Sequence, residues 1–233
     1  MNTENQNQSS SASDDALDPF EVRVLAVLAE KEALTPDIYP LSLNALTTGC
    51  NQLSSRDPVM SISDTTVQEV LDRLAQRKLV AEVSQAGARV SKYEHRMRMK
   101  WTLEQDKLAI LTMLMLRGPQ TAGEIRTRVG RMHEFASVTE VETGLQFLID
   151  KYPPLVARLA RAPGTKESRY AHLLSGDEVL QQQELVGGAD ATMSAASGSR
   201  ADRIEHLERE VARLNDAVAS LTQQFENFKK QFE

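Results

Sequence analysis

An apolar pattern of helical spacing that ends in a Leu-Val pair occurs twice in this chain. The two copies are Val67, Leu71, Leu74 and Leu79-Val80, and then Val141, Leu145, Leu148 and Leu155-Val156. Each copy follows two shorter helical patterns and precedes two strand-like runs. Three helices followed by a two-stranded hairpin is the element order of a winged helix-turn-helix, a fold that most often binds nucleic acid. The repeat therefore predicts two similar modules in tandem.

Apolar faces define the three helices expected in the first copy. The first begins after Asp18, with Pro19 suited to its opening turn, and its pattern stops before Thr35. A shorter second helix is expected over residues 41–46, and Ser63 stands at the N-cap of the third. If DNA is the ligand, this third helix is the one expected to read it.

The segment after the third helix alternates between apolar and basic residues. A hairpin tip is expected at residues 85–88, and the return strand runs over residues 89–101. One parity of that strand is apolar and consists of Tyr93, Met97, Met99 and Trp101. The other parity consists of Lys92, Glu94, Arg96, Arg98 and Lys100. Period-two alternation predicts one apolar and one basic face for this wing.

The second copy repeats these signals. Its first helix is expected to end at Gly118. Thr121 and Glu124 have capping-box spacing for its second helix, and Ser137 and Glu140 have the same spacing for its third. Strands are expected at residues 155–160 and 169–174, with a turn at residues 162–165.

A heptad repeat follows residues 175–200, which are expected to form a flexible linker because they offer little to bury. Its apolar positions, of which the first seven are the expected dimerisation residues, are Ile204, Leu207, Val211, Leu214, Val218, Leu221, Phe225, Phe228 and Phe232. β-Branched residues at the a positions and leucines at the d positions favour a parallel homodimer. The alternative is a helix that folds back on the core.

These signals divide the chain into five segments. They are a disordered leader at 1–18, winged-helix domain 1 at 19–101, winged-helix domain 2 at 102–174, the linker at 175–200 and a coiled coil at 201–233. The expected fold class is mainly α with small β-hairpins (α+β). It consists of two tandem winged helix-turn-helix domains plus a C-terminal coiled-coil helix.

The net charge of −6 is unevenly distributed. Residues 1–18 and 175–199 carry four acidic residues each and no basic ones, and from residue 200 onward six basic residues face seven acidic ones. Residues 19–174 therefore carry a charge of +3. That value permits a basic, nucleic-acid-binding face without requiring one.

The composition also bounds the other function classes. No apolar run approaches the roughly 20 residues of a membrane span, and the start of the chain lacks the pattern of a signal peptide. The single Cys50 excludes an internal disulfide framework and is expected to be a buried thiol. No metal-ligand spacing, phosphate-binding Gly loop or nucleophile motif is found. We expect a cytoplasmic protein that is not an enzyme and binds neither cofactor, metal nor membrane.

Three stretches read LAEKEALTPDIYPLSLNALTTGCNQLSSRDPVMSIS at residues 28–63, KYEHRM at residues 92–97 and SRYAHLLSG at residues 168–176. In these stretches the chain resembles the YceH family of bacterial proteins of unknown function. The resemblance covers about two thirds of the chain and implies a tandem winged-helix fold with no established activity. Family sequences commonly carry Lys at the position of Leu53 and Asn at the position of Ser55.

The candidate DNA-binding residues lie on the third helix and the wing of the first copy. The helix offers side chains able to contact bases or phosphates, namely Thr65, Thr66, Gln68 and Arg73. The wing offers positive charges for phosphates, namely Arg89, Lys92, Arg96, Arg98 and Lys100. The alternative for the wing is a solvated strand face. In the second copy Glu140, Glu142 and Asp150 on the third helix argue against its entry into a groove.

Two further groups of polar residues allow alternative interpretations. Around the connection between the second and third helices of the first copy lie Asn44, Asn51, Gln52, Arg56 and Asp57. They form either a specific contact surface or, as we favour, a scaffold for the loop through side-chain to backbone hydrogen bonds. His95 shares the apolar parity of its strand and is expected to be a hydrogen-bonded core residue.

Two functions from different classes fit these observations. The leading hypothesis is a tandem winged-helix protein that binds duplex DNA as a dimeric transcriptional regulator or chromosome-associated factor, because dimerisation raises the effective concentration of two weak basic faces. The alternative is a protein-protein interaction scaffold that uses its winged helices for docking, with no direct DNA binding. The neutral-to-acidic third helices favour that alternative.

Overall fold

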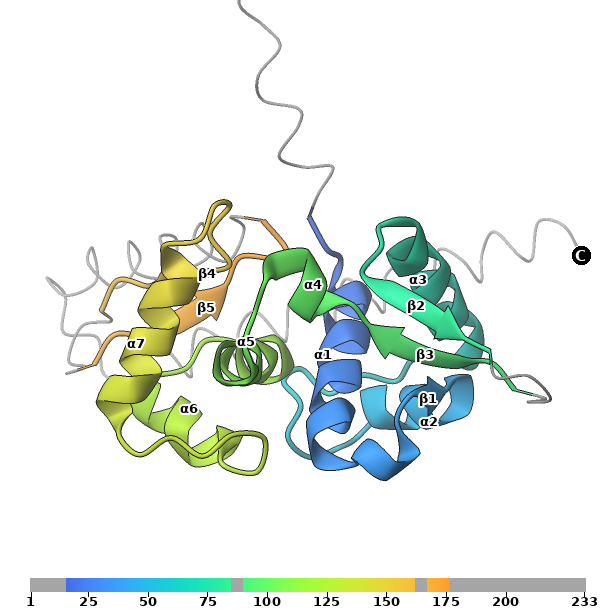
Figure 1. Ribbon diagram of the computed structural model, residues 1–233, viewed down its shortest axis with the longest axis horizontal. Coiled ribbons are helices and arrows are strands. Elements are labelled where there is room, and N and C mark those ends of the chain that lie inside the picture. The colour runs from blue at the N-terminus through green and yellow to red at the C-terminus, as the bar shows by residue number, and fades with distance from the viewer. Residues whose placement is uncertain (1–15, 85–89, 162–166, 177–233) are drawn as a thin grey trace, which may run out of the picture. The chain divides into compact units, whose positions relative to one another are not determined.

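The computed structural model describes residues 16–84, 90–161 and 167–176 (Figure 1). The chain divides into two units, residues 1–184 and 185–233, and all described residues belong to the first. The predictions of a disordered leader, a flexible linker, a coiled coil and a dimer therefore concern residues that lie wholly or largely outside the described part. The same holds for Arg89 and for the seven dimerisation residues from Ile204 to Phe225.

The first copy contains more elements than the sequence predicts. Its elements are α1 (Pro19–Leu34), the 3-10 helix η1 (Pro36–Ile38), β1 (Leu41–Ser42), α2 (Leu43–Cys50), α3 (Asp64–Gln76), β2 (Val80–Val83), β3 (Lys92–His95) and α4 (Met97–Trp101). The strands form an antiparallel sheet in the order β1-β3-β2 (Figure 1). Leu41 thus begins a short strand that pairs with Tyr93, whereas the sequence predicts it as helical.

The second copy repeats this order in a reduced form. Its elements are α5 (Gln105–Arg117), α6 (Ala122–Val129), α7 (Val138–Ile149), β4 (Val156–Arg158) and β5 (Tyr170–His172). In place of a full third strand, Gln120 forms an isolated antiparallel bridge with Tyr170. The expected strands at 155–160 and 169–174 are thus shorter, although backbone hydrogen bonds between Leu159 and Arg169 and between Leu173 and Leu155 extend the pairing.

Local capping explains where several helices begin. Asp18 accepts from the amides of Phe20 and Glu21, and the Glu21 carboxylate accepts from the Asp18 amide. The predicted capping box of Thr121 and Glu124 is confirmed at the start of α6. At α7 the Ser137 hydroxyl accepts from the amide of Glu140 as predicted, but the Glu140 carboxylate accepts from the amide of Ala136 instead of that of Ser137.

The two copies share one hydrophobic core. Helix α1 packs against α2 and α3, and α5 packs in the same way against α6 and α7 (Figure 1). Helices α1 and α5 also pack against each other, and Leu25, Leu28, Leu111 and Leu114 are all fully buried. The described residues thus form seven α-helices and two small antiparallel sheets, which confirms the mainly helical, mixed composition of the fold.

The long return strand predicted over residues 89–101 is wrong beyond His95. Strand β2 begins at Val80, the residue that pairs with His95, so a longer β3 would have no partner strand. The amide of Arg96 still donates to the carbonyl of Leu79, and the chain then forms α4, whose backbone groups bond within the helix. Because of this turn, Arg96, Arg98 and Lys100 do not share a strand face with Lys92.

Across residues 16–84, 90–161 and 167–176, no helix has the length and apolar character needed to cross a membrane.

Candidate functional site

Helix α3 presents the candidate DNA-binding residues in different ways. Ser63 caps the helix as predicted, since its hydroxyl accepts from the amide of Thr66 at 3.1 Å. Thr65 is exposed, while the Thr66 hydroxyl lies 2.9 Å from that of Ser63. Gln68 is held at both ends, because its amide nitrogen donates to Asp72 at 2.9 Å and its oxygen accepts from the Tyr93 hydroxyl at 3.1 Å. Only Thr65 of this group is fully available to a ligand.

Arg73, the cation of this group, is bound within the chain. Its Nη2 lies 2.5 Å from Asp18 Oδ2, and its Nε donates to Glu21 Oε1 at 3.2 Å. The same Glu21 carboxylate pairs with Arg77 at 3.1 Å. The two acidic residues that cap α1 therefore also neutralise the positive charges of the arginines at the C-terminal end of α3. Three of the other exposed residues of α3 are acidic, namely Asp64, Glu69 and Asp72.

The basic residues of the predicted wing are dispersed and partly paired. Arg96 Nη2 lies 2.8 Å from Glu94 Oε1, and Arg98 Nη2 lies 3.0 Å from Glu32 Oε2 on α1. Lys92 on β3 and Lys100 on α4 form no ion pair within the described residues. The prediction of a continuous basic strand face is therefore wrong, because the backbone turns after His95 and two of the arginines bind carboxylates.

His95 is a hydrogen-bonded core residue, as expected, with 6% of its surface exposed. Its Nδ1 accepts from the amide of Met97 at 3.2 Å, so the ring proton lies on Nε2, which is 3.2 Å from Glu32 Oε2. The hydrogen bond from His95, together with the hydrogen bond and charge of Arg98, lowers the pKa of Glu32 to about 2 against the opposing effect of burial. This group joins α1, β3 and α4.

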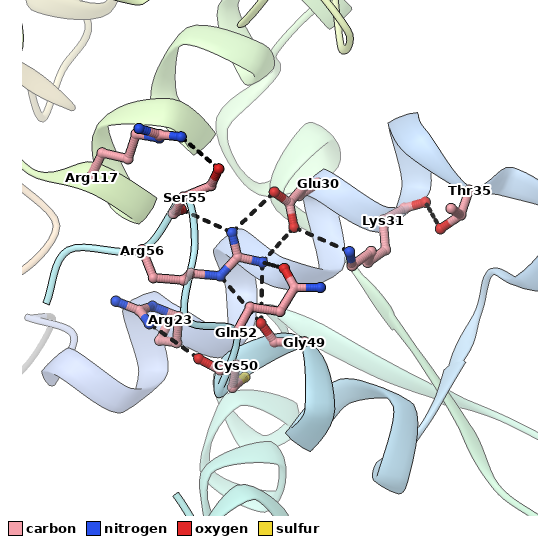
Figure 2. A network of polar contacts seen from close by, with 10 residues as sticks. All are labelled: Arg23, Glu30, Lys31, Thr35, Gly49, Cys50, Gln52, Ser55, Arg56 and Arg117. Carbon is pink, nitrogen blue, oxygen red and sulfur yellow. Dashed lines mark hydrogen bonds and ion pairs between the residues drawn. The ribbon is translucent and has the colours of Figure 1, made fainter. Parts of the chain in front are cut away.

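The polar loop after α2 is organised around a buried arginine (Figure 2). The Arg56 side chain is 0% exposed, and its two Nη atoms lie 3.1 and 2.6 Å from the Glu30 carboxylate oxygens. It also donates to the carbonyl oxygen of Gly49 and, at 2.7 Å, to the side chain of Gln52. A bidentate pair with further hydrogen bonds is the arrangement that makes a buried charge tolerable.

A second buried arginine lies beside the first. Arg23 of α1 is 1% exposed and donates to the carbonyl oxygens of Cys50 and Pro58 at 3.2 and 2.6 Å. Burial, and then the charge of Arg56, lower the pKa of Arg23. Cys50 is fully buried, which confirms the expected structural thiol, and burial raises its pKa to about 12. The thiol therefore stays protonated and unreactive.

Side-chain to backbone hydrogen bonds also fix the far end of this loop. The Asn51 side chain donates to the carbonyl and accepts from the amide of Ile62, both at 2.8 Å. Asn51, Gln52 and Arg56 thus scaffold the loop, the interpretation favoured from the sequence. Asn44 and Asp57 are exposed, and their side chains form no hydrogen bond within the described residues.

Another group of arginines lies where the two copies meet, and the sequence analysis missed it. Arg117, at the end of α5, donates to the hydroxyl of Ser55 at 2.5 Å (Figure 2). Arg128 of α6 and Arg169 beside β5 both bind Glu124, with N to O distances of 3.5 and 3.1 Å. We call Ser55, Arg117, Arg128 and Arg169 the junction cluster. The four-residue spacing of Glu124 and Arg128 indicates that one pair, but the separation of Ser55, Arg117 and Arg169 in the sequence left no local signal of their proximity.

The buried pair of Glu30 with Arg56 did leave a signal. Arg23 and Glu30 lie seven residues apart, on one face of a helix whose other residues from 22 to 29 are all apolar. Charged residues at that spacing within an apolar helix indicate buried partners. Within the described ranges, no group of three His, Cys, Asp or Glu residues is arranged to hold a metal ion.

Comparison with known proteins places the chain in a family. The profile of the family described as "Protein of unknown function, DUF480" matches residues 17–165. A UPF0502 protein of Herminiimonas arsenicoxydans is 62% identical over 239 residues, which cover 100% of both chains. A UPF0502 protein of Janthinobacterium is 67% identical over 213 residues, covering 91% of this chain and 89% of the relative.

A UPF0502 protein of Azoarcus is 50% identical over 217 residues, covering 93% of this chain and 94% of the relative. The chain belongs to this bacterial family of unknown function, and the resemblance to YceH proteins agrees with that membership. The matched region includes the buried Glu30 and Arg56 pair and most of both copies.

Proposed function

We propose that the chain is a tandem winged-helix protein that docks onto another protein and does not read DNA. The order of helix, short strand, helix, helix and hairpin supports the fold, because the short strand pairs with the return strand of the hairpin in the first copy. The bridge of Gln120 with Tyr170 is the matching feature of the second copy. Such domains serve both DNA binding and protein docking, so the role has to be argued from the surface.

One observation carries the docking role. Three of the arginines expected to bind DNA, namely Arg73, Arg96 and Arg98, each bind a carboxylate of the same chain. A phosphate would have to displace these carboxylates, and the exposed Glu69 and Asp72 on α3 would repel it. The surface of α3 therefore suits a protein partner better than a duplex.

Helix α7 supports the same conclusion for the second copy. Glu140 and Glu142 are exposed on it, and so are Val138 at 39% and Phe147 at 42%. The acidic residues are unsuited to a DNA groove, whereas a partly exposed aromatic residue such as Phe147 is typical of protein interfaces. We propose α7 as the docking helix.

Site-specific photo-crosslinking in cells tests this role. A photoreactive amino acid replaces Thr143, which is exposed on α7, and in a matched control it replaces the exposed Asp37 in η1. We expect a discrete, nuclease-resistant protein adduct from position 143 and none from position 37. A nucleic-acid adduct at position 143, or equal adducts at both positions, would contradict the proposal.

Duplex DNA binding is the second candidate, and it is favoured by Lys92 and Lys100, which form no ion pair with any residue that the structure describes. Anisotropy titration with a random duplex between 50 and 200 mM salt, conditions in which phosphate-binding proteins lose roughly 10³- to 10⁵-fold in affinity, measures it directly. Docking predicts only weak, non-specific affinity that Arg96→Ala and Arg98→Ala leave unchanged. Tight binding that is lost in Lys92→Ala and Lys100→Ala would establish DNA as the ligand.

The dimeric state of the proposed scaffold remains a prediction from the heptad repeat. Two copies of the docking helix joined by a coiled coil would raise the effective concentration for a partner with two binding sites. Sedimentation equilibrium of the full chain and of a Leu207→Asp, Leu214→Asp variant tests this point. We expect a dimer for the former and a monomer for the latter.

A further inference from the structure

The charges of the junction cluster are incompletely balanced. Arg128 and Arg169 share the Glu124 carboxylate, and the nearby Arg56 has Glu30 as its partner. Arg117 has no carboxylate partner in the part of the chain that the structure describes, and its side chain there donates to the Ser55 hydroxyl. Its Nε is buried, and no described residue accepts a hydrogen bond from it. Among the described residues, one guanidinium group therefore lacks the acidic partner that its neighbours have.

The surroundings of Arg117 are unfavourable to an isolated positive charge. Burial lowers the pKa of Arg117, and the charges of Arg128 and then of Arg56 lower it further. The one acidic residue that counteracts this effect, Glu30, is already bound to Arg56 in a bidentate pair. An added anion beside Arg117 would be attracted by several guanidinium groups at once.

The loop that carries Ser55 is held in place before any ligand arrives. Ser55 has a left-handed backbone with a φ of 61°, and the next residue, Arg56, is anchored in the core. The amide of Asp57 donates to the carbonyl oxygen of Leu116 at 2.8 Å, which ties the loop of the first copy to the end of α5. A preorganised site loses less conformational entropy on binding.

The same loop also presents an apolar side chain. Leu53 lies two residues before Ser55 and is 84% exposed, in a segment whose two ends are fixed by Asn51 and Arg56. An apolar side chain next to polar groups on one anchored loop offers a partner protein both an apolar and a polar contact.

The geometry favours a carboxylate over a phosphate polymer. Within the chain Glu124 and Glu30 already bind guanidinium groups of this region, so the neighbouring site suits the same chemistry. A duplex carries one charge per about 1.7 Å of its axis and is bound through a broad basic surface. The junction cluster has only three arginines, and two of them already bind Glu124, so its basic surface is too small for a duplex.

We propose that the junction cluster binds a carboxylate of an acidic segment of a partner protein, with Leu53 contacting an adjacent apolar side chain. The inference rests on the proposed docking function and adds the chemistry of the partner to it. Arg117 supplies a guanidinium group that has no acidic partner among the described residues, Ser55 positions it, and Arg128 and Arg169 supply the surrounding positive charge.

A labelled peptide of sequence Glu-Glu-Leu-Glu-Glu, titrated with the full chain by fluorescence anisotropy, tests the site. Arg117→Ala should raise the dissociation constant about tenfold, the loss typical of one charged hydrogen-bonded contact. Arg117→Lys should raise it less, because the charge remains but the planar fork is lost. The matched control is Arg131→Ala, an exposed arginine with no ion pair in the described residues, which should change it less than twofold.

Three outcomes would overturn the inference. Equal weakening by Arg117→Ala and Arg131→Ala would show diffuse attraction to a charged surface. Displacement of the peptide by duplex DNA, with a stronger dependence on Arg117 than the peptide shows, would assign the site to phosphate. If Arg117→Ala lowers the melting temperature, the Ser55→Ala variant is titrated in its place. We expect Ser55→Ala to raise the dissociation constant of the peptide about threefold, and an unchanged dissociation constant would overturn the inference.

The two experiments test the carboxylate site and the docking role of α7 independently. If position 143 gives no protein crosslink but the peptide still binds through Arg117, the docking role of α7 is removed and the junction cluster stays a carboxylate site. An unchanged crosslink together with peptide binding that is insensitive to Arg117 would do the reverse.

Discussion

The two copies share a topology but stabilise it with different side chains. Helix α1 buries Glu21, Arg23 and Glu30, whereas Thr112 is the buried polar residue of α5. The apolar pattern common to both copies is thus sufficient for the arrangement of helices and hairpin. The buried charges of the first copy determine something else, namely how its loop after α2 is held against α1.

A Tyr-x-His sequence occurs at the same register in both hairpins and shows the difference most clearly. His95 pairs across the sheet with Val80, and His172 pairs with Val156. His95 contacts Glu32, whereas Nδ1 of His172 is buried without a partner in the described residues. Burial lowers the pKa of His172 to about 4. The hydrogen bonding of a histidine at this position therefore depends on whether the neighbouring helix offers it a carboxylate.

The largest expected difference in the free energy of unfolding is between variants of the buried ion pair in the first copy and of a more exposed ion pair in the second. Arg56→Ala leaves the Glu30 carboxylate buried and unpaired, and should lower the free energy of unfolding by about 3–5 kcal/mol. Arg128→Ala removes a partner of the more exposed Glu124 and should cost about 0–1 kcal/mol. Urea denaturation measures both. Similar losses in the two variants would contradict the difference drawn between the copies.

Acid should destabilise the two copies in two successive pH windows, which overlap between about pH 4.5 and 4. The pKa of His172 is lower in the folded state than the ordinary value of 6.5, so the unfolded state binds the proton first and stability falls as pH drops from about 6.5 to 4. The loss approaches about 3 kcal/mol, at 1.36 kcal/mol per pKa unit. His172→Gln should flatten this part of the curve.

Glu32 acts at lower pH. Its folded pKa of about 2 lies below the ordinary value of 4.5, so the stability it contributes above pH 4.5 is lost as pH falls through 4.5 towards 2. Glu32→Gln should remove this second step and leave the first. Free energies of unfolding measured from pH 7 to 3 test both variants, and a single step abolished by either substitution would contradict the assignment.

A glycine at a close helix contact should tolerate substitution by Ala less well in the first copy than in the second. A Cβ on Gly49 of α2 would lie 2.6 Å from Val27 Cγ1, and one on Gly144 of α7 would lie 2.6 Å from Ile110 Cδ1. Valine is stiff at χ1, whereas the end of an isoleucine can turn away. Substitution by Ala should therefore cost about 2 kcal/mol at Gly49 and about 1 kcal/mol at Gly144.

Thermal unfolding of the two variants checks this order. Gly123→Ala in α6 is the matched control, because its nearest contact would be 3.9 Å away, and it should gain up to about 1 kcal/mol from helix propensity. Val27→Ala should partly rescue Gly49→Ala. A Gly144→Ala variant less stable than Gly49→Ala would reverse the comparison.

The smallest expected difference concerns how each copy fixes the connection before its third helix. Asn51 bonds both backbone groups of Ile62 in a half-buried position, and Asn51→Ala should cost about 1–2 kcal/mol. The exposed Arg126 donates to the carbonyl oxygens of Phe135 and Ala136, and Arg126→Ala should cost about 0.5 kcal/mol. Hydrogen exchange of the two loops should rank them in the same order.

Local signals in the sequence predicted the starts of the helices well. Ser63 and Thr121 cap α3 and α6 as expected, because capping depends on residues three positions apart. The alternation of residues 92–101 predicted too long a strand, because it continues along the sequence after the partner strand β2 has ended. Helix α4 forms at that point to satisfy backbone groups that no strand could bind.

The candidate sites were harder to predict than the elements. The sequence shows that Arg73, Arg96 and Arg98 are basic, but their charges are neutralised by Asp18, Glu94 and Glu32. Two of these three acidic residues, Asp18 and Glu32, are distant from their arginines in the sequence, so only the tertiary structure reveals the pairing. A count of basic residues therefore overestimates the charge available to a ligand.

By itself the sequence determined the repeat, the helical order and the buried state of Cys50, since apolar periodicity and caps act over a few residues. The tertiary structure alone decided which charges are free. Ion pairs such as Arg56 with Glu30 depend on residues brought together from different helices, and so does the lack of an acidic partner for Arg117 among the described residues. Electrostatic energy depends on distance and burial in space.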